Sequence, residues 1–359
     1  RPPFFFNAYA GKSYAQESRG LGDVYKRQVL LEMSFQNQKL DSLLKFADPV
    51  IAGILDKALS EKEILPQEAL SLFDAKGLDF HLVGLVADTL RSRRVGETVT
   101  YVVNRNINFT NVCVKQCGFC AFSRDFREEE GYFLPIEEIL RRAKEAYHYG
   151  ASEVCVQAGL PPDMDANLYE NICRSIKNEI PDMHIHGFSP EEILYGATRQ
   201  DISPAEYLVK LKEAGVDTIP GTAAEILNQE LRDKISPGRI KAKDWVDIIK
   251  TAHKLGIKST ATMMFGHLET LEDRVNHIAT IREIQKESGG FTEFVPLNFI
   301  SSEAPMYKHQ LHDGIRNGAN GNDVLLVHAI ARIMLNNVID LSLIHISEPT
   351  RLLSISYAV

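Results

Sequence analysis

The chain has 359 residues, with 40 lysines and arginines against 48 aspartates and glutamates, which gives a net charge of −8 at pH 7. An acidic balance without a basic cluster argues against nucleic acid as a partner, and the lack of a long apolar run in the sequence argues against a membrane span. Three of the five cysteines fall in one short segment, so we expect no disulfide framework and a reducing, cytoplasmic location.

The two ends of the chain resemble the two translations of a sequencing adapter. The matching stretches are Ser18–Gln28 and Leu341–Arg351. Segments of this origin are left out of fold reasoning. We therefore expect residues 1–28 and 341–359 to be non-native, with no stable packed place in the fold.

Residues 29–98 are predicted to form a helical cap at the N-terminus. Apolar residues recur at helical spacing, with an interruption at Pro49. A second helix follows Pro66 and ends before Gly77, in the usual order of proline before a helix and glycine after it. The expected helices lie around 43–55, 68–75 and 80–94.

Over residues 99–340, strand-like and helix-like segments alternate, which favours parallel strands joined by helical crossovers. Strands are expected near 100–110, 152–157, 183–188, 216–220, 258–265 and 292–297. Helices are expected near 135–149, 166–179, 204–214, 223–233, 242–255, 269–287 and 321–337. A further strand should begin near Val338, where the native sequence stops, so the α/β domain is expected to be truncated at its C-terminus. The alternation fits a barrel or a doubly wound sheet, and the pattern alone leaves both open.

The expected strands carry apolar side chains on one face and polar side chains on the other, because side chains alternate with period two. In the second strand Val154 and Val156 lie opposite Cys155, and in the third Ile185 lies opposite His186. A polar face inside a barrel predicts a lumen that binds a polar substrate, since buried polar groups need partners. The alternative is that these positions lie at exposed strand ends.

Three cysteines follow the first strand with the spacing C-x₃-C-x₂-C: Cys113, Cys117 and Cys120. Three thiolates hold three irons of a cubane cluster and leave the fourth iron open, whereas iron–sulfur clusters usually have four cysteine ligands. The alternative is structural zinc, which requires four closed ligands and usually a second cysteine or histidine pair. Cys155 and Cys173 are isolated in a strand and a helix and form no such pair. We therefore expect an open [4Fe-4S] cluster.

Two later segments also follow strands, at the face where the catalytic loops of a barrel gather. Gln157 and Gly159 precede Leu-Pro-Pro, which is equally consistent with a plain turn. Gly221 permits a close backbone approach after the fourth strand. Glu225 is expected in a helix that opens there, where it either binds a ribose hydroxyl or an ammonium group, or completes a capping box with Thr222.

His267 and Glu269 follow the fifth strand at the same rim and are candidates for catalysis. A lone histidine at a rim is equally consistent with a structural role. The sequence contains no Ser/His/Asp arrangement, phosphate loop or His-x₃-His pair that competes with these candidates.

The cysteine spacing, with an aromatic residue just before the last cysteine, resembles the signature of the radical S-adenosylmethionine (SAM) enzymes. In that superfamily the open iron binds the amino and carboxylate groups of SAM, and an electron from the cluster cleaves SAM to a 5′-deoxyadenosyl radical. The resemblance implies a (βα) TIM-type barrel, with the backbone of Phe119 near the adenine and the segment Gln157-Ala-Gly159 near the amino group of SAM. The cluster ligands that it implies are Cys113, Cys117 and Cys120.

Longer segments narrow the resemblance to the CofH family, which acts in the biosynthesis of the deazaflavin FO and of coenzyme F(420). They are Ile107–Cys113, Cys120–Arg124, His184–Pro190, Pro220–Ile226, Thr260–Thr270 and Gly289–Leu297. The segment Pro-Gly-Thr-Ala-Ala-Glu-Ile distinguishes the chain from the related MqnE enzymes. Ala158 departs from the pattern, because relatives often carry two glycines there.

This resemblance implies cleavage of the Cα–Cβ bond of L-tyrosine and transfer of the 4-hydroxybenzyl group to 5-amino-6-(D-ribitylamino)uracil. The implied cofactors are a [4Fe-4S] cluster and SAM, and the implied partners are CofG and an electron donor of the ferredoxin or flavodoxin type. One alternative is a menaquinone-pathway radical SAM enzyme similar to MqnE or MqnC. A more remote one is a non-catalytic iron–sulfur or zinc-binding module, which would be smaller and carry a fourth cysteine.

Overall fold

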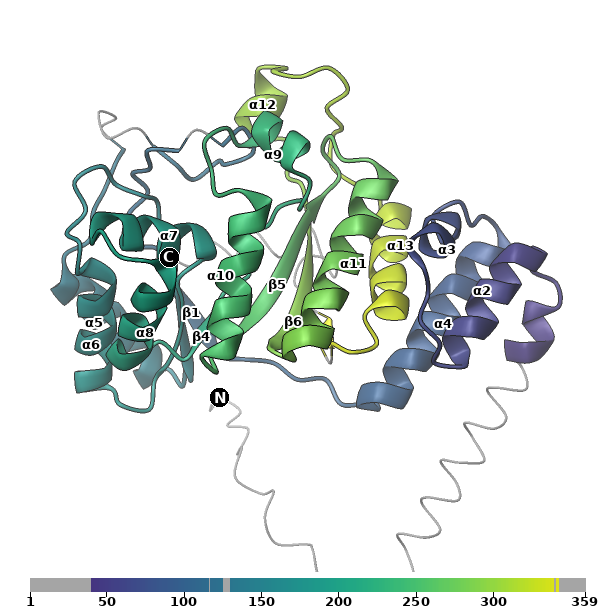
Figure 1. The fold of residues 1–359 in the computed structure, drawn as a ribbon, viewed down its shortest axis with the longest axis horizontal. Coiled ribbons are helices and arrows are strands. Elements are labelled where there is room, and N and C mark those ends of the chain that lie inside the picture. The colour runs from purple at the N-terminus through teal and green to yellow at the C-terminus, as the bar shows by residue number, and fades with distance from the viewer. Residues whose placement is uncertain (1–39, 116, 125–129, 339, 342–359) are drawn as a thin grey trace, which may run out of the picture.

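The computed structural model describes residues 40–115, 117–124, 130–338 and 340–341. A group of N-terminal helices lies beside a larger unit in which strands and helices alternate (Figure 1). Of the two adapter-like segments only Leu341 is described, and it pairs with Phe294 of the neighbouring strand and packs against the core, so the prediction that these segments lack a packed place is wrong at this residue. For the other residues of the two segments the prediction lies outside the described part of the chain.

In the described part of the chain, seven parallel strands form one sheet, in the order β1-β2-β3-β4-β5-β6-β7. They are β1 Asn104–Ile107, β2 Glu153–Val156, β3 His184–Gly187, β4 Thr218–Ile219, β5 Lys258–Phe265, β6 Phe291–Asn298 and β7 Asp340–Leu341. A doubly wound sheet reverses its strand order at a switch point, whereas this order follows the chain without reversal. The fold is therefore the barrel type that the resemblance implied. Its last strand begins at Asp340, two residues later than the sequence suggested.

Helices connect the strands and flank the sheet (Figure 1). They are α5 Ile136–His148, α6 Leu168–Glu179, α7 Pro190–Arg199, α8 Pro204–Ala214, α9 Gln229–Ile235, α10 Ala242–Lys254, α11 Leu271–Ser288, α12 Pro305–Lys308 and α13 Gly321–Met334. The sequence analysis missed α7, which begins directly after β3. Its start has a clear local cause, because the Ser189 side chain accepts from the Glu192 N–H while the Glu192 carboxylate accepts from the Ser189 N–H, and Pro190 occupies the first helical position.

The helix expected near 223–233 in fact begins at Gln229, after the N-cap residue Asn228. Ala223 and Glu225 have φ angles of 65° and 46°, in the left-handed region that a right-handed helix does not allow. The prediction that Glu225 opens a helix is therefore wrong, and so is its alternative, a capping box with Thr222. The segment from Pro220 is instead an irregular loop.

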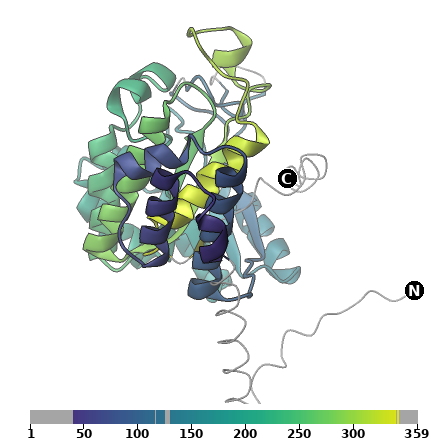
Figure 2. The same ribbon diagram turned by 90° about the vertical axis from the view of Figure 1, so that its right-hand side faces the viewer.

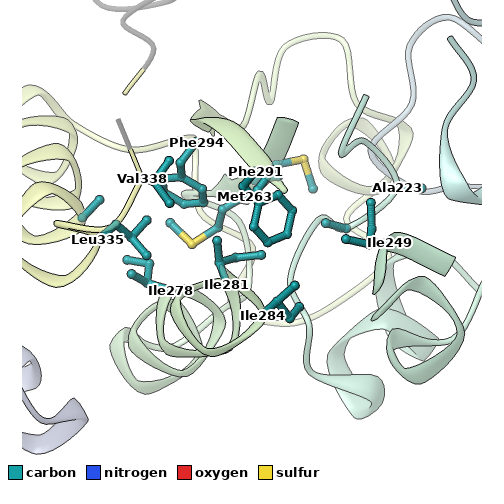
Figure 3. Close-up of a cluster of buried hydrophobic side chains, with 14 of the residues drawn as sticks. Ala223, Ile249, Met263, Ile278, Ile281, Ile284, Phe291, Phe294, Leu335 and Val338 are labelled. Carbon is teal, nitrogen blue, oxygen red and sulfur yellow. The ribbon is translucent and has the colours of Figure 1, made fainter. Parts of the chain in front are cut away.

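The apolar face of the sheet packs against the surrounding helices, as Figure 3 shows for one part of the core. Met263 of β5 and Phe294 of β6 lie against Ile278 and Ile281 of α11, with Val338 beside them, and all five side chains are fully buried. Burying one side chain of this kind stabilises a fold by about 1.5–3 kcal/mol. This packing fixes β5 and β6, and with them the loops at their carboxyl ends.

The N-terminal helices α2 Pro49–Leu59, α3 Pro66–Leu72 and α4 Leu78–Val95 lie against the side of the barrel (Figure 2). Helix α3 packs on α11 and α4 packs on α13. The Arg282 guanidinium of α11 donates a 2.7 Å hydrogen bond to the Ile64 carbonyl and pairs with Glu63 at 3.1 Å. None of the helices in the described part of the chain is long and apolar enough to cross a membrane.

The inner face of the first strands is polar, as the alternation predicted. Val154, Val156 and Ile185 are fully buried in the core, while the intervening Cys155 and His186 are half-buried on the opposite face. A row of polar side chains therefore faces the inside of the barrel.

Candidate active site

The cysteine segment follows β1 as a loop that backbone hydrogen bonds hold at several points. The Cys113 N–H donates to the Arg124 carbonyl at 3.1 Å. The Gly118 N–H donates to the Ile235 carbonyl at the end of α9 at 2.8 Å, and the Gly118 carbonyl accepts from Met306 of α12 at 2.7 Å. A Cβ on Gly118 would lie 2.9 Å from the Met306 side chain, so glycine lets these segments approach. The loop is therefore positioned by elements far away in the sequence.

The three cysteines line one cavity of about 200 Å³. The Cys113 sulfur accepts from the Lys115 N–H at 3.5 Å, and the Cys120 sulfur accepts from the Ser123 N–H at 3.4 Å. Burial raises the pKa of Cys117 to about 12 although the nearby Arg239 lowers it in part, so its thiolate form requires a further positive partner. A metal centre is such a partner, because coordination deprotonates a thiol outright. Three thiols with N–H donors to sulfur fit an iron–sulfur cluster.

The described side chains also bear on the zinc alternative. In this part of the chain no three Cys, His, Asp or Glu side chains gather closely enough to hold a single metal ion. A cubane presents a separate iron to each thiolate, so its ligands need not converge on one point. The predicted ligand set of three cysteines is thus placed together along one cavity wall, in an arrangement suited to a cluster.

The segment after β2 forms the adjoining wall, with Gln157 and Gly159 among the lining residues. The Gly159 N–H donates to the Thr110 carbonyl at 3.0 Å, and a Cβ on Gly159 would meet the Val112 carbonyl oxygen at 2.2 Å. The Ala158 N–H donates to the Glu192 carboxylate at 2.9 Å. Glycine is therefore required at 159 for this wall to lie against the cysteine loop.

The segment after β4 closes the opposite side of the cavity. The Gly221 N–H donates to the Thr260 hydroxyl at 2.9 Å, and the Thr262 hydroxyl donates to the Gly221 carbonyl at 2.7 Å. The indole N–H of the buried Trp245 donates to the Thr222 carbonyl at 3.1 Å. These contacts hold the chain so that the Glu225 side chain lines the cavity.

Arg239 is the main cavity residue that the sequence analysis missed. Its guanidinium lies 3.2 Å from a Glu191 carboxylate oxygen, 3.1 Å from one of Glu225 and 3.6 Å from the Cys117 sulfur. Burial lowers the pKa of Arg239, but Cys117 and the two carboxylates raise it by a larger amount, so the pKa lies above its ordinary value. The side of the cavity next to Cys117 therefore carries charges of both signs.

Comparison with known proteins places the chain in a family. The family description Radical SAM superfamily matches residues 107–281. The 5-amino-6-(D-ribitylamino)uracil–L-tyrosine 4-hydroxyphenyl transferase of Methanothermobacter thermautotrophicus is 46% identical over 287 residues, which cover 80% of this chain and 77% of that protein. The enzyme of the same name from Methanocaldococcus jannaschii is 48% identical over 282 residues, which cover 78% and 77%. The chain belongs to the CofH family of radical SAM enzymes.

Other relatives are longer or more distant. The FO synthase of Nocardia farcinica is 47% identical over 271 residues, which cover 76% of this chain but only 31% of that protein. Among solved structures, the [FeFe]-hydrogenase maturase HydG of Carboxydothermus hydrogenoformans matches with a TM-score of 0.66 at 18% identity, over 91% of this chain and 73% of that one. Methylornithine synthase (PylB) matches with a TM-score of 0.57 at 17% identity, over 82% and 87%. These two structures share the fold.

Within this CofH-family site, the remaining candidates stand outside the cavity lining. Phe119 is not among the lining residues, and the Arg239 guanidinium carbon, from a residue that does line the cavity, lies 5.8 Å from the centroid of its ring. Gly221 likewise contributes no lining atoms, but a Cβ there would lie 2.3 Å from the Thr260 carbonyl oxygen. Both residues therefore act on the cavity through the segments that they position.

His267 and Glu269 do not line the cavity and lie in a separate, buried ionic cluster. The Glu269 carboxylate accepts from the Gly266 N–H at 2.7 Å and pairs with Arg274 at 2.7 Å and with Arg316. Burial raises the pKa of Glu269, but His267 and the arginines lower it to about 2, so the group is ionised. The structure thus gives this pair a role in holding the loop after β5, and a catalytic role stays a prediction.

Proposed function

We propose that this chain transfers the 4-hydroxybenzyl group of L-tyrosine to 5-amino-6-(D-ribitylamino)uracil, as the names of its transferase relatives indicate. The observation that carries this proposal is the convergence of Cys113, Cys117 and Cys120 on one cavity in a CofH-family barrel. The cavity lies at the carboxyl ends of the strands, where barrel enzymes carry out their chemistry. Its walls come from the segments after β1, β2, β3 and β4, together with Arg239.

The three cysteines would hold the [4Fe-4S] cluster, and the rest of the cavity would hold SAM. When bound, these cofactors supply the radical that begins the breakage of the tyrosine Cα–Cβ bond, while the protein supplies position and excludes water. The methionine end of SAM carries an ammonium and a carboxylate. Glu191 and Glu225 offer anions for the first, and Arg239 offers a cation for the second.

The partners of the reaction follow from the chemistry and from the relatives. The chain matches only 31% of the Nocardia farcinica FO synthase, whose remaining length has room for a second activity. A separate CofG protein would supply that activity here. Reductive chemistry needs an electron donor of the ferredoxin or flavodoxin type, and a cytoplasmic location keeps the cluster away from oxidants.

The test is a mass-spectrometric assay of the anaerobically reconstituted protein with SAM, a reductant, the aminouracil and tyrosine labelled with carbon-13. Label at Cβ of tyrosine should enter the uracil adduct, and label at Cα should appear in 2-iminoacetate or its hydrolysis product glyoxylate. Cα label in the adduct would contradict the proposed bond cleavage.

The cofactor assignment has its own test in the cysteine variants. Cys117→Ala should lose both the brown absorbance of the cluster and the reductive cleavage of SAM. Cys173→Ala is the matched control, since Cys173 is buried in α6 away from the cavity. The assignment fails if Cys173→Ala loses the cluster while Cys117→Ala keeps it.

A further inference from the structure

Three adjacent strands place a continuous set of polar side chains on the inner face of the barrel. The Thr218 hydroxyl of β4 lies 2.7 Å from Nδ1 of His186 and 2.8 Å from Nε2 of His184, both on β3. His184 in turn lies 3.8 Å from the Glu153 carboxylate of β2, and Asn104 of β1 donates to that carboxylate at 3.3 Å. We call Glu153, His184, Thr218 and His186 the inner polar row.

The hydrogen-bond chemistry of this row leaves one group free for a ligand. A threonine hydroxyl carries a single proton, so it donates to one imidazole nitrogen and accepts from the other. His186 engages Thr218 through Nδ1, and its Nε2 has no partner among the described residues. Burial lowers the pKa of His186 to about 4, so the ring is neutral at pH 7. The row therefore ends in an unpaired nitrogen on a neutral, half-buried ring.

The row is connected to the cofactor cavity through Gln157. The Gln157 amide nitrogen lies 3.6 Å from the Cys155 sulfur, and Cys155 stands directly opposite His186 in the register of β2 and β3. Since two residues along a strand span about 7 Å, His186 lies roughly that far along the strands from the level of the cavity wall. Gln157 itself lines the cavity, and its side-chain oxygen accepts a hydrogen bond from the Thr222 hydroxyl at 3.3 Å. The row therefore lies about two residues along the strands from the cavity wall.

The two regions offer different chemistry to ligands. The cavity presents the carboxyl groups of Glu191 and Glu225 and the guanidinium of Arg239, which suit the charged amino-acid groups of SAM or of tyrosine. The inner polar row presents a hydroxyl and two imidazoles, with a carboxylate at its far end whose pKa burial raises. A hydroxyl and the neutral imidazole of His186 each donate and accept hydrogen bonds, which suits a neutral chain of hydroxyls.

We propose that the inner polar row, and His186 above all, binds the ribityl chain of the aminouracil substrate. This inference rests on the proposed transferase function and assigns one part of its substrate to one part of the barrel. His186 donates to or accepts from a ribityl hydroxyl through Nε2, while Thr218 fixes the ring through Nδ1. Because the uracil ring itself need not touch the row, the row selects for the chain rather than for the base.

The experiment titrates the reconstituted holoenzyme with two unreactive ligands, 6-(D-ribitylamino)uracil and 6-(methylamino)uracil, and compares their dissociation constants. In His186→Ala the ribityl ligand should bind about tenfold more weakly, the loss expected for one hydrogen bond at a half-buried site, while the methyl ligand should change by less than about twofold. Thr218→Val keeps the shape of the side chain but removes the bridging hydroxyl. This variant should weaken the binding of the ribityl ligand alone, by a smaller factor than His186→Ala does.

His253 provides the matched control, because its ring also bridges two hydroxyls, those of Ser288 at 2.6 Å and Ser259 at 2.9 Å, away from the cavity. His253→Asn should not alter the ratio of the two dissociation constants. An equal loss for both ligands in His186→Ala, or no loss for either, would overturn the assignment, as would a rise confined to the KM of tyrosine. If His186→Ala lost the ribityl ligand selectively but the wild-type protein formed no adduct from tyrosine, the proposed function would fail and the row would still be shown to bind the chain.

Discussion

Replacing Arg239 with methionine tests whether the buried charges of the cofactor cavity depend on one another. The guanidinium pairs with Glu191 at 3.2 Å and with Glu225 at 3.1 Å. The exposed fractions of the three side chains are only 14%, 6% and 12% respectively. Methionine is long enough to fill much of the same space but pairs with neither carboxylate.

The size of the effect follows from this burial. An exposed ion pair contributes about 0–1 kcal/mol, whereas removal of one partner from a buried pair costs about 3–5 kcal/mol because a charge is left without a counterion. Lys115 lies 3.5 Å from Glu191 and compensates in part. We therefore expect Arg239→Met to lower the free energy of unfolding by about 3 kcal/mol. The matched control is Arg141→Met, since Arg141 pairs with Glu138 at 2.7 Å but is 59% exposed, and it should cost far less than Arg239→Met.

The assay is urea unfolding followed by the fluorescence of Trp245, the single tryptophan of the sequence. Its buried indole donates to the Thr222 carbonyl, so it reports on the cavity wall directly. Adding Glu225→Gln to Arg239→Met should recover part of the loss, because the variant removes one of the unpaired charges. If Arg239→Met cost no more than the Arg141→Met control, solvent would be screening these charges and the reasoning would be refuted.

Three further predictions concern the cavity wall and the core behind it. Gly159→Ala should reduce the iron bound per chain, because its Cβ would meet the Val112 carbonyl at 2.2 Å; full iron content would show that the wall moves without cost. Burial lowers the pKa of His277 to about 3 from 6.5, so its contribution to stability is complete above pH 6.5 and is lost as the pH falls toward 3, by about 1.4 kcal/mol per unit. The free energy of unfolding, measured in urea at pH 7 and 5.5, should fall with this slope. His277→Phe should remove the part of the pH dependence that comes from the uptake of one proton on unfolding, and an unchanged slope would contradict the assignment. Glu269→Gln leaves the fully buried Arg274 without its nearest anion and should cost about 3–5 kcal/mol in thermal or urea unfolding, and a loss under about 1 kcal/mol would show that the cluster is not coupled.

The strands and most helices could be predicted because their signals are local. The strand expected over 258–265 is β5 residue for residue, since its period-two pattern and its flanks leave little choice. Helix α7 was missed although Ser189 and Glu192 form a capping box at its start, because β3 ends at Gly187 and only one residue lies between the strand and that cap. The sequence therefore does contain a local signal for the start of this helix.

The loop after β4 shows the opposite case. Thr222-Ala-Ala-Glu225 has the local pattern of a helix start, yet the chain stays irregular until Asn228. Hydrogen bonds from β5 keep this loop irregular. The Met264 N–H donates to the Glu225 carbonyl at 2.8 Å, and the Thr262 hydroxyl donates to the Gly221 carbonyl. Tertiary contacts outweighed a local preference that is worth about 1 kcal/mol.

The same distinction separates the site residues that the sequence revealed from those that it hid. Cys113, Gln157 and Glu225 each belong to a segment that directly follows a strand, so fold logic alone places them at one end of the barrel. Arg239 lies 122 residues from Cys117 and in a loop without a motif, and only the folded chain brings the two within 3.6 Å. A charge that completes a cavity from a distant loop leaves no local pattern.

The distribution of charge inside the barrel then has a functional consequence. Acidic and basic side chains gather at the rim, where Arg239 stands beside the cysteines, whereas the Thr218 hydroxyl and the neutral ring of His186 lie deeper on the inner face, with the Glu153 carboxyl group at the far end of the row. Zwitterions such as SAM and tyrosine would be stabilised at the rim and disfavoured deeper in, since a charge in a half-buried neutral environment lacks a counterion. A neutral ligand has no such preference and gains from the deeper hydrogen-bonding groups. Charge alone would thus order the two kinds of ligand along the barrel, with Gln157 between them, and would bring the transferred group and its acceptor together at that level.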